Sequence, residues 1–534
     1  MSTLSIALKR PSKTTVHSNA LLLMAIPLIL SGFTHLWNPI EFPSIHTDEG
    51  HYLHRAMHIL EGSGLQEPRS IYTKSYDHPY FGQIFLAAVL GVIDYPQALN
   101  PIPSDVQSIQ MLYMVPRVFM GLLAVADTFL IYKILERRYN KNVAFIAAII
   151  FAVMPVSWLL RRILLDNLLL PLLLCSILFA GYLKKSRAIA YVDNAVNNIN
   201  KEKFLLILFS GIFLGLAIFT KFPAFTFIPL VGCLIFTNNN KSWKILGLWF
   251  IPVIGIPLLW PAYAISIGDL DGWWKGFFWQ AAGRIERPLW MALDILFKID
   301  PVLIVLGTVG ILFAAVKKDF FPLLWVAPFL VLLQVLGYVS YWFFIPILPA
   351  VAVGSGRLIE EVLLFVYNQR KRKILIISII SSIYIFGFVS TMMLITTNLN
   401  STYYQVVASI IQHLHPIGSK GSEDKTTLIG NRWVPGFSWI PDFVFPTDLD
   451  YKKFYTNVSH IGTDNILLVV DKGFVKSLEE QEISEELKLA YDNTSTTEII
   501  KDDTGNFDLS QYPYTSMREN RPIGKIEIRT NLPR

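Results

Sequence analysis

Long uninterrupted apolar stretches constrain this chain more than any other feature of its sequence. They recur between residues 21 and 395 of the 534 residues, and a helix needs roughly 20 apolar residues to cross a bilayer. Eleven stretches approach or reach that length, so the sequence predicts an all-α polytopic membrane protein with about eleven transmembrane helices. The stretches cover approximately residues 20–37, 113–135, 143–160, 163–183, 204–220, 222–236, 245–267, 301–316, 320–337, 341–358 and 374–395.

A twelfth apolar stretch, residues 80–93, is short for a span and is predicted to lie along the membrane surface. The distribution of charge supports leaving it out of the count. With the N-terminus inside, the short inner segments then carry nineteen Lys and Arg and the outer loops carry ten, as the positive-inside rule expects. This topology predicts a cytoplasmic N-terminus and two large external loops, residues 38–112 and 268–300.

Charge and cysteine content exclude several classes of protein. Charged residues make up only 16% of the chain, which argues against a soluble enzyme. The net charge of +6 arises mostly from the inner loops, so it signals topology rather than nucleic-acid binding. Cys175 and Cys233 both fall in apolar stretches, which leaves no disulfide framework and no CxxC metal site. The first stretch lacks an obvious cleavage site and is expected to anchor a multi-pass protein in the plasma membrane.

Residues 398–534 differ in composition from residues 1–397, the expected membrane domain. They contain 19 Asp and Glu against 14 Lys and Arg. The runs TTLIGN, NILLVVDK, TEIIKDD and GKIEIRT, with an acidic helical pattern over 475–489, predict a small soluble α/β domain. The predicted topology places this domain outside the cell. Three N-x-[ST] sequons fall within it, at Asn400, Asn457 and Asn493.

The first external loop is chemically unusual. Asp48 and Glu49 begin an amphipathic stretch, where the positive end of a helix favours anions. A carboxylate placed there can accept a proton from a hydroxyl group or help to hold a cation beside a phosphate. His51, His54 and His58 follow on one helical face, but no HExxH pattern supports a zinc site.

Other ionisable residues gather at the same predicted face of the membrane. Arg117 lies near the outer end of one span, Arg161 and Arg162 end the next, Asp166 opens the following one, and Lys221 separates two more. Ionisable groups at membrane depth are expensive and by default mark functional sites. Because Arg and Lys bind phosphate through charge-assisted hydrogen bonds, this set predicts a site for a lipid phosphate.

Several motifs resemble those of a known superfamily. TDEGHY (47–52) and YDHPYFGQI (76–84) resemble the DE-x-x-Y and (D/E)-H-P-P-x-G pair in the first external loop of GT-C glycosyltransferases. The similar branch is that of protein O-mannosyltransferases and lipid A aminoarabinose transferases. RRILLD, GLAIFTKFP and YWFFIPILPAVA resemble three further elements of this branch, in the same order. The chain departs from the pattern at Tyr80, Phe222 and Tyr341–Trp342, which replace a proline, a glycine and an Arg-Tyr pair.

The resemblance implies a GT-C fold and the transfer of one sugar from a polyprenyl-phosphate donor to an acceptor outside the membrane. It implies that Asp48 is the catalytic aspartate and general base, with Glu49 beside it. Asp77 matches a second acidic position, which with Asp48 could bind a divalent cation or orient the acceptor. Asp166 is a supporting residue. The residues expected to bind the donor phosphate are His78, Arg117, Arg161, Arg162 and Lys221.

Two alternatives stay open on the sequence. An oligosaccharyltransferase has a similar architecture, although a WWD-type motif is missing because Lys275 follows Trp273–Trp274. A lipid or sugar transporter would carry ionisable residues near the bilayer midplane and two matching halves. Asp127 is the one acidic residue deep in a predicted span, and no repeat relates the halves. The aromatic run 272–280 either covers the lipid or sugar or forms a belt at the headgroup level. The sequence does not distinguish a protein, lipid or glycan acceptor.

Overall fold

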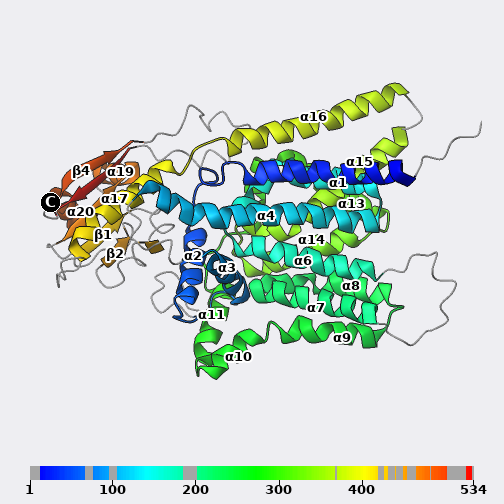
Figure 1. Cartoon of the computed structure of the whole chain (residues 1–534), viewed down its shortest axis with the longest axis horizontal. Helices are drawn as coiled ribbons and strands as arrows, with labels where there is room; N and C mark the ends of the chain where they lie inside the picture. Colours follow the sequence, from blue (N-terminus) through cyan, green and yellow to red (C-terminus); the bar gives the residue numbers. More distant parts are fainter. Residues whose placement is uncertain are drawn as a thin grey trace, which may run out of the picture.

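The protein is a helical bundle with a small mixed sheet at one end (Figure 1). The computed structural model describes residues 13–65, 76–95, 105–183, 201–366, 370–418, 426–430, 439–440, 449–453, 465–480, 483–501 and 525–531.

Each predicted apolar stretch lies on a bundle helix or on a helix with its adjoining turn. The helices are α1 (Lys13–Leu36), α4 (Val106–Arg138), α5 (Lys141–Val153), α6 (Leu165–Tyr182), α7 (Lys201–Thr220), α8 (Ile228–Asn238), α9 (Trp243–Gly255), α13 (Pro301–Val316), α14 (Phe321–Leu336), α15 (Leu348–Val366) and α16 (Arg370–Ile395). Among the described residues, four spans satisfy the length and composition needed to cross a membrane, or up to seven if each bent pair counts once. The remaining stretches lie on shorter apolar helices, so the count of eleven stays a prediction.

Three 3₁₀ segments interrupt the bundle and shape the site. They are η2 (Pro155–Arg161), η3 (Phe222–Phe227) and η4 (Tyr341–Ile347). Each contains a proline near its start or inside it, and proline removes a backbone donor and breaks α-helical bonding. At η2 the chain bends by 70° from α5. These breaks leave Arg161 and Lys221 at turns rather than on continuous helices.

Several short helices lie at the end of the bundle that carries the sheet. They are α2 (Thr47–Leu60), α3 (Phe81–Val92), α10 (Leu259–Ser266), α11 (Leu270–Ala282) and α12 (Leu289–Ile299). Helices α2 and α11 run across the bundle axis (Figure 1), and α12 meets α13 at 116°. With 12 residues, α3 is about 18 Å long, too short for a hydrocarbon core of about 30 Å. Its predicted surface position is consistent with this length. Parts of the predicted first loop, residues 66–75 and 96–104, lie outside the described residues.

The C-terminal region forms the predicted α/β unit. The strands are β1 (Thr426–Gly430), β2 (Leu449–Lys453), β3 (Ile466–Val470), β4 (Ser495–Ile500) and β5 (Ile526–Thr530), in the order β2-β1-β3-β5-β4. Strand β1 is parallel to β2 and β3, whereas β5 is antiparallel to β3 and β4. All four predicted strands are present, and β2 was not predicted. The single helix expected over 475–489 is instead α19 (Lys472–Glu479) followed by α20 (Glu485–Asp492).

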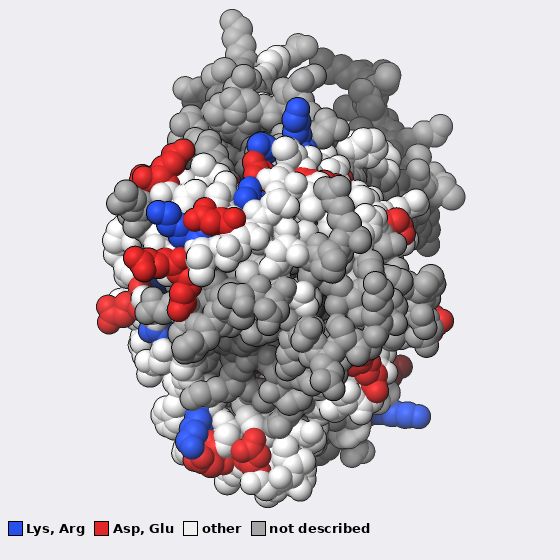
Figure 2. All heavy atoms as spheres, turned by 90° about the vertical axis from the view of Figure 1, so that its left-hand side faces the viewer, with Lys and Arg blue, Asp and Glu red and all other residues white. Residues whose placement is uncertain are grey.

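This C-terminal unit sits at the same end as α2 and exposes charged side chains of both signs (Figure 2). Its first helix, α17 (Ser401–Gly418), packs against α4 of the bundle and against β4 and β5. The Trp439 indole N–H donates to the Tyr113 hydroxyl at 3.0 Å. The arrangement agrees with the prediction that the first loop and the C-terminal domain share one side of the membrane.

The predicted sequons have different environments. Asn400 is completely buried, so it is not a glycosylation acceptor in this fold, contrary to what its sequon suggested. Asn493 follows α20 as its C-cap residue, and Asn457 lies outside the described residues.

Candidate active site

A polar cavity of about 490 Å³ lies at the N-terminus of α2. Asp48, with 38% of its side chain exposed, faces this cavity together with residues from four other parts of the chain. The structure therefore brings together several residues that the sequence singled out. The lining consists of Thr47, Asp48, His51, Tyr52, Asp77, His78, Lys221, Trp279, Gly283, Arg284, Ile285, Glu286, Arg287, Tyr338, Trp342 and Phe343.

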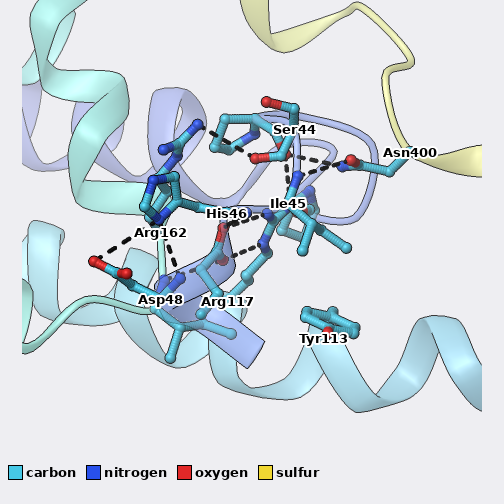
Figure 3. Close-up of polar contacts among 12 residues, drawn as sticks. Ser44, Ile45, His46, Asp48, Tyr113, Arg117, Arg162 and Asn400 are labelled. Atoms are coloured by element: carbon cyan, nitrogen blue, oxygen red, sulfur yellow. Dashed lines mark hydrogen bonds and ion pairs between the residues drawn. The ribbon is translucent and has the colours of Figure 1, made fainter. Parts of the chain in front are cut away.

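His46 organises the start of α2 around Asp48 (Figure 3). Its Nδ1 accepts a hydrogen bond from the Asp48 backbone N–H at 3.2 Å, and Asp48 Oδ2 lies 3.9 Å from the same nitrogen. Burial lowers the pKa of His46, which keeps the ring neutral and Nδ1 able to accept. The ring packs edge-on against Trp342, at 4.6 Å between centroids. Asp48 thus projects from a fixed helix start.

Glu49 points away from the cavity and has a structural environment. It is completely buried, and Arg117 binds both of its oxygens, from Nε at 3.0 Å and from Nη2 at 2.9 Å. The backbone N–H groups of His46 and Ile163 also donate to the carboxylate. Neither Glu49 nor Arg117 lines either of the cavities described here. This ion pair does not support a catalytic Glu49 or a phosphate-binding Arg117, and both roles stay predictions.

Arg161 and Arg162 are also directed elsewhere. Both are almost completely buried and neither lines these cavities. Arg161 donates to the Trp37 carbonyl and lies over the ring of Phe42, whereas Arg162 donates to the Ser44 carbonyl at 3.3 Å (Figure 3). Each arginine thus contacts a backbone carbonyl beside α1 or α2, while its Nε and Nη1 are buried without an acceptor among the described residues, and the predicted phosphate-binding role of the pair stays a prediction.

Asp77 is engaged by cationic and polar partners at the edge of the cavity. Arg55 Nη1 lies 2.6 Å from Asp77 Oδ1, and His51 Nε2 lies 3.7 Å from Oδ2. Burial alone would raise the pKa of Asp77, but Arg55 and the neighbouring histidines hold it well below its usual range. The predicted divalent-cation pair of Asp48 and Asp77 does not fit this arrangement. In the described part of the chain, no three His, Cys, Asp or Glu side chains are grouped for metal binding.

Lys221 stands where the polar cavity meets a second, apolar one. Its ammonium group lies 2.6 Å from Asp166 Oδ2 and 4.4 Å from the centre of the Phe343 ring. The structure thus pairs these two predicted site residues at the turn between α7 and η3.

The apolar cavity has a volume of about 250 Å³ and is walled by α6, η3, α11 and α14. Side chains such as Leu169, Phe222, Phe277, Phe329 and Leu333 line it. It shares with the polar cavity the residues Asp77, His78, Lys221, Arg284, Tyr338 and Phe343. The two cavities are therefore contiguous, and we call the shared residues the junction.

The wall of the apolar cavity contains three donors that the sequence did not indicate, and one of them, Arg284, belongs to the junction. Arg284 Nε, Gln280 Nε2 and Trp260 Nε1 are buried without a hydrogen-bond acceptor among the described residues, and all three side chains line the apolar cavity. Gln280 and Arg284 are four residues apart, at and just beyond the end of α11. The aromatic run at 272–280 had indicated a cover for the site, but its extension to Arg284 carried no motif.

His78 contributes a neutral group to the junction. Burial, with a smaller effect of Lys221 and Arg284, lowers its pKa to about 3 against the opposing effect of Asp77. At neutral pH the ring can donate one hydrogen bond and accept another, but it does not supply a positive charge.

Comparison with known proteins finds one matching family model. The family model described as dolichyl-phosphate-mannose-protein mannosyltransferase matches residues 70–294, which include Asp77, His78, Lys221 and Arg284. Comparison of the sequence with curated proteins finds no match.

Two solved structures share the architecture. ArnT from Cupriavidus metallidurans, bound to undecaprenyl phosphate, is similar over 98% of this chain and 99% of its own, with 11% identity and a TM-score of 0.55. The oligosaccharyltransferase AglB from Archaeoglobus fulgidus, in complex with an inhibitory peptide and a dolichol-phosphate, is similar over 82% of this chain and 65% of its own. That pair has 11% identity and a TM-score of 0.51. These two likenesses confirm the predicted GT-C fold.

Proposed function

We propose that this protein transfers a single sugar from a polyprenyl-phosphate donor to an acceptor on the side of the membrane that carries the C-terminal domain. The observation that carries the proposal is the continuity of an apolar and a polar cavity through the Lys221–Arg284 junction. An amphiphilic donor has the same order of parts, with an apolar chain, a phosphate and a polar sugar. The solved relatives ArnT and AglB were captured with undecaprenyl phosphate and dolichol-phosphate, respectively.

The phosphate fits where the two cavities adjoin, because Arg284 belongs to the junction and Trp260 lines the apolar cavity beside it. Arg284 Nε and Trp260 Nε1 have no acceptor among the described residues, and a buried donor without an acceptor costs about 1–3 kcal/mol. Phosphate oxygens would satisfy them while the polyprenyl chain lies against the aromatic and aliphatic walls of the apolar cavity.

The charge at the junction favours a monophosphate donor. Lys221 is paired with Asp166 and Arg55 with Asp77, whereas Arg284 has no ion-pair partner among the described residues. The junction with these counter-ions therefore carries one net positive charge. A sugar phosphodiester has one negative charge, but a diphosphate-linked donor has at least two. This balance favours single-sugar transfer from a monophosphate carrier over the oligosaccharyltransferase alternative.

In this mechanism Asp48 is the general base. Its carboxylate accepts the proton of the acceptor hydroxyl as the hydroxyl oxygen attacks the anomeric carbon. The bond from that carbon to the phosphate oxygen breaks, and the oxygen keeps the electron pair. The departing polyprenyl phosphate gains a negative charge, which Lys221 and Arg284 stabilise. Neutral His78 can donate a hydrogen bond to the same group.

The proposal includes a location and a set of partners. The protein is a multi-pass protein of the plasma membrane, with a cytoplasmic N-terminus and an extracytoplasmic C-terminal domain. Its partners are the lipid-linked sugar and a protein, lipid or glycan acceptor. The charge asymmetry of the loops supports this orientation.

The decisive experiment supplies the purified protein, in lipid nanodiscs, with a panel of polyprenyl-phosphate sugars and acceptors of each class. Release of polyprenyl phosphate together with a glycosylated acceptor supports the proposal and identifies both substrates. If donors cross sealed vesicles without any new glycosidic bond, the proposal is wrong and the protein is a transporter. Consumption of diphosphate-linked oligosaccharides alone would favour the oligosaccharyltransferase instead.

A further inference from the structure

The segment just before α2 sets the position of Asp48 and has no helix or strand of its own. It comprises residues 38–45, and we call it the pre-α2 segment. Without internal secondary structure, its geometry depends on hydrogen bonds to its backbone from other parts of the chain. Those bonds come from three distant places: α4, Arg162 at the end of η2, and the start of the C-terminal domain.

Asn400 binds this segment through both ends of its amide (Figure 3). Its Nδ2 donates to the carbonyls of Ile40 at 2.7 Å and Pro43 at 2.8 Å, and its Oδ1 accepts from the Ile45 N–H at 3.0 Å. The side chain is completely buried and uses three of the four hydrogen bonds that an amide can make. No other neutral side chain of similar size offers two donors and an acceptor in this geometry.

Arg117 binds the same two carbonyls from the opposite side. Its Nη1 donates to Pro43 at 2.9 Å and to Ile40 at 3.3 Å, while the rest of the guanidinium holds Glu49. Glu49 in turn accepts from the His46 N–H, and His46 accepts from the Asp48 N–H. A continuous set of buried and partly buried hydrogen bonds therefore runs from Asn400 to the backbone of Asp48.

The C-terminal domain reinforces this contact. The Leu399 N–H donates to the Glu41 carbonyl at 2.9 Å, and the Tyr404 hydroxyl donates to the Ile40 carbonyl at 3.2 Å. Tyr404 lies 6.1 Å from the ring of Tyr113, which accepts the hydrogen bond from Trp439. The start of the C-terminal domain therefore helps to hold the pre-α2 segment, which leads into the candidate active site.

We infer that Asn400 is a positioning residue for Asp48, through which the C-terminal domain fixes the catalytic carboxylate relative to the bound donor. This inference rests on the proposed function. The donor is held by Lys221 and Arg284, which belong to other elements. Loss of Asn400 would therefore displace the base without removing the donor site.

The test compares Asn400→Ala with Asn398→Ala in the full-length protein. Asn398 Oδ1 accepts from the N–H groups of Asn400 and Ser401 and so caps the start of α17, but no bond from its side chain to the pre-α2 segment is recorded among the described residues. We expect Asn400→Ala to lower kcat by about 10- to 100-fold with little change in donor KM, because misplacement by about 1 Å can cost that much. Asn398→Ala should leave kcat within about threefold of the wild type.

A second readout does not depend on turnover. Hydrogen–deuterium exchange at residues 38–49 should become faster in Asn400→Ala than in Asn398→Ala, because the Ile45 N–H loses its acceptor. If Asn400→Ala fails to fold, Tyr404→Phe removes one bond to the Ile40 carbonyl and should lower kcat in the same direction by a smaller factor.

The outcomes separate this inference from the proposed function. If Asp48→Asn is inactive but Asn400→Ala and Tyr404→Phe keep full kcat and unchanged exchange, the positioning role is wrong and the proposed function stands. An equal loss of kcat in Asn400→Ala and Asn398→Ala also overturns it, because general support of α17 would then explain the effect. If Asp48→Asn keeps full transfer activity, the proposed mechanism itself fails.

Discussion

Two polar clusters lie at the same end of the molecule and differ in whether their hydrogen bonds are satisfied internally. In the cluster of Glu49, Arg117 and Asn400, the carboxylate accepts from Arg117 and from two backbone N–H groups, and all three guanidinium nitrogens donate. In the second cluster, by contrast, buried donor atoms of Arg284 at the junction and of Trp260 in the apolar cavity have no acceptor among the described residues.

The difference indicates which cluster supports the fold and which binds a ligand. Buried polar groups in folded proteins are nearly always paired, so a satisfied cluster needs nothing further. Unpaired donors at the meeting point of two cavities are explained if the acceptor arrives with the substrate. Asp48 lines the polar cavity, whereas its neighbour Glu49 belongs to the cluster whose hydrogen bonds are satisfied. Four substitutions test this difference.

The largest effect is expected for Asp48→Asn. An amide cannot take up the proton of the acceptor hydroxyl, so the transfer rate should fall by about 10²- to 10⁴-fold. The side chain is 38% exposed, so thermal stability in detergent should stay close to that of the wild type. The matched control is Glu61→Gln, an exposed acid at the far end of α2, which should keep full activity. A folded Asp48→Asn protein with wild-type turnover would contradict the assignment.

The next largest effect is expected for Glu49→Gln, and it concerns stability. The substitution leaves the buried Arg117 charge without its counter-ion, which typically costs about 3–5 kcal/mol. The unfolding free energy in denaturant should fall by that amount, and the yield of folded protein with it. Glu286→Gln, at an exposed position beside the cavity, should change stability by less than about 0.5 kcal/mol. Equal stability of the two variants would show that the first cluster does not support the fold.

A smaller effect is expected for Arg284→Gln, and it concerns donor binding. Charge-assisted hydrogen bonds contribute about 1.5–3 kcal/mol, so the affinity for polyprenyl phosphate should fall by roughly 10- to 100-fold. The unfolding free energy should stay the same or rise slightly, because the substitution removes a buried donor, Arg284 Nε, that has no acceptor among the described residues. Arg287→Gln is the control, since Arg287 lines the polar cavity but not the apolar one. If both variants bind polyprenyl phosphate like the wild type, the phosphate lies elsewhere.

The sequence predicted those structural features that depend on a short stretch of chain. Apolar length predicted the helices of the bundle, and the amphipathic start of α2 predicted where Asp48 would lie. The motifs singled out Asp77, His78 and Lys221, and all three line the polar cavity. Composition alone separated the C-terminal domain, and β-type runs located four of its strands.

The sequence was uninformative where long-range contacts decide the role of a side chain. Glu49 and Arg117 resemble site residues in sequence but bind each other across 68 positions. Arg161 and Arg162 form a cationic pair in the sequence, but each donates to a backbone carbonyl of a segment beside α1 or α2, a contact that no local pattern indicates. Asn400 lies in an N-x-[ST] sequon. The sequence could not show that its side chain is buried, because its hydrogen-bond partners lie about 360 residues away. Only the fold determines whether a polar group is already satisfied.

The smallest effect is expected at His78 and concerns the pH dependence of stability. Because the folded-state pKa is about 3 and the unfolded value about 6.5, the unfolded chain binds a proton first as the pH falls. His78 therefore makes stability decline from about pH 6.5 towards pH 3. His78→Gln should flatten this decline between pH 6.5 and 4.5, where Asp77 stays ionised in the folded state. Part of the slope should remain, because burial lowers the pKa of His46 as well. Thermal midpoints measured across this range test the expectation, and an unchanged slope in His78→Gln would mean that the ring is hydrated and titrates normally at the junction.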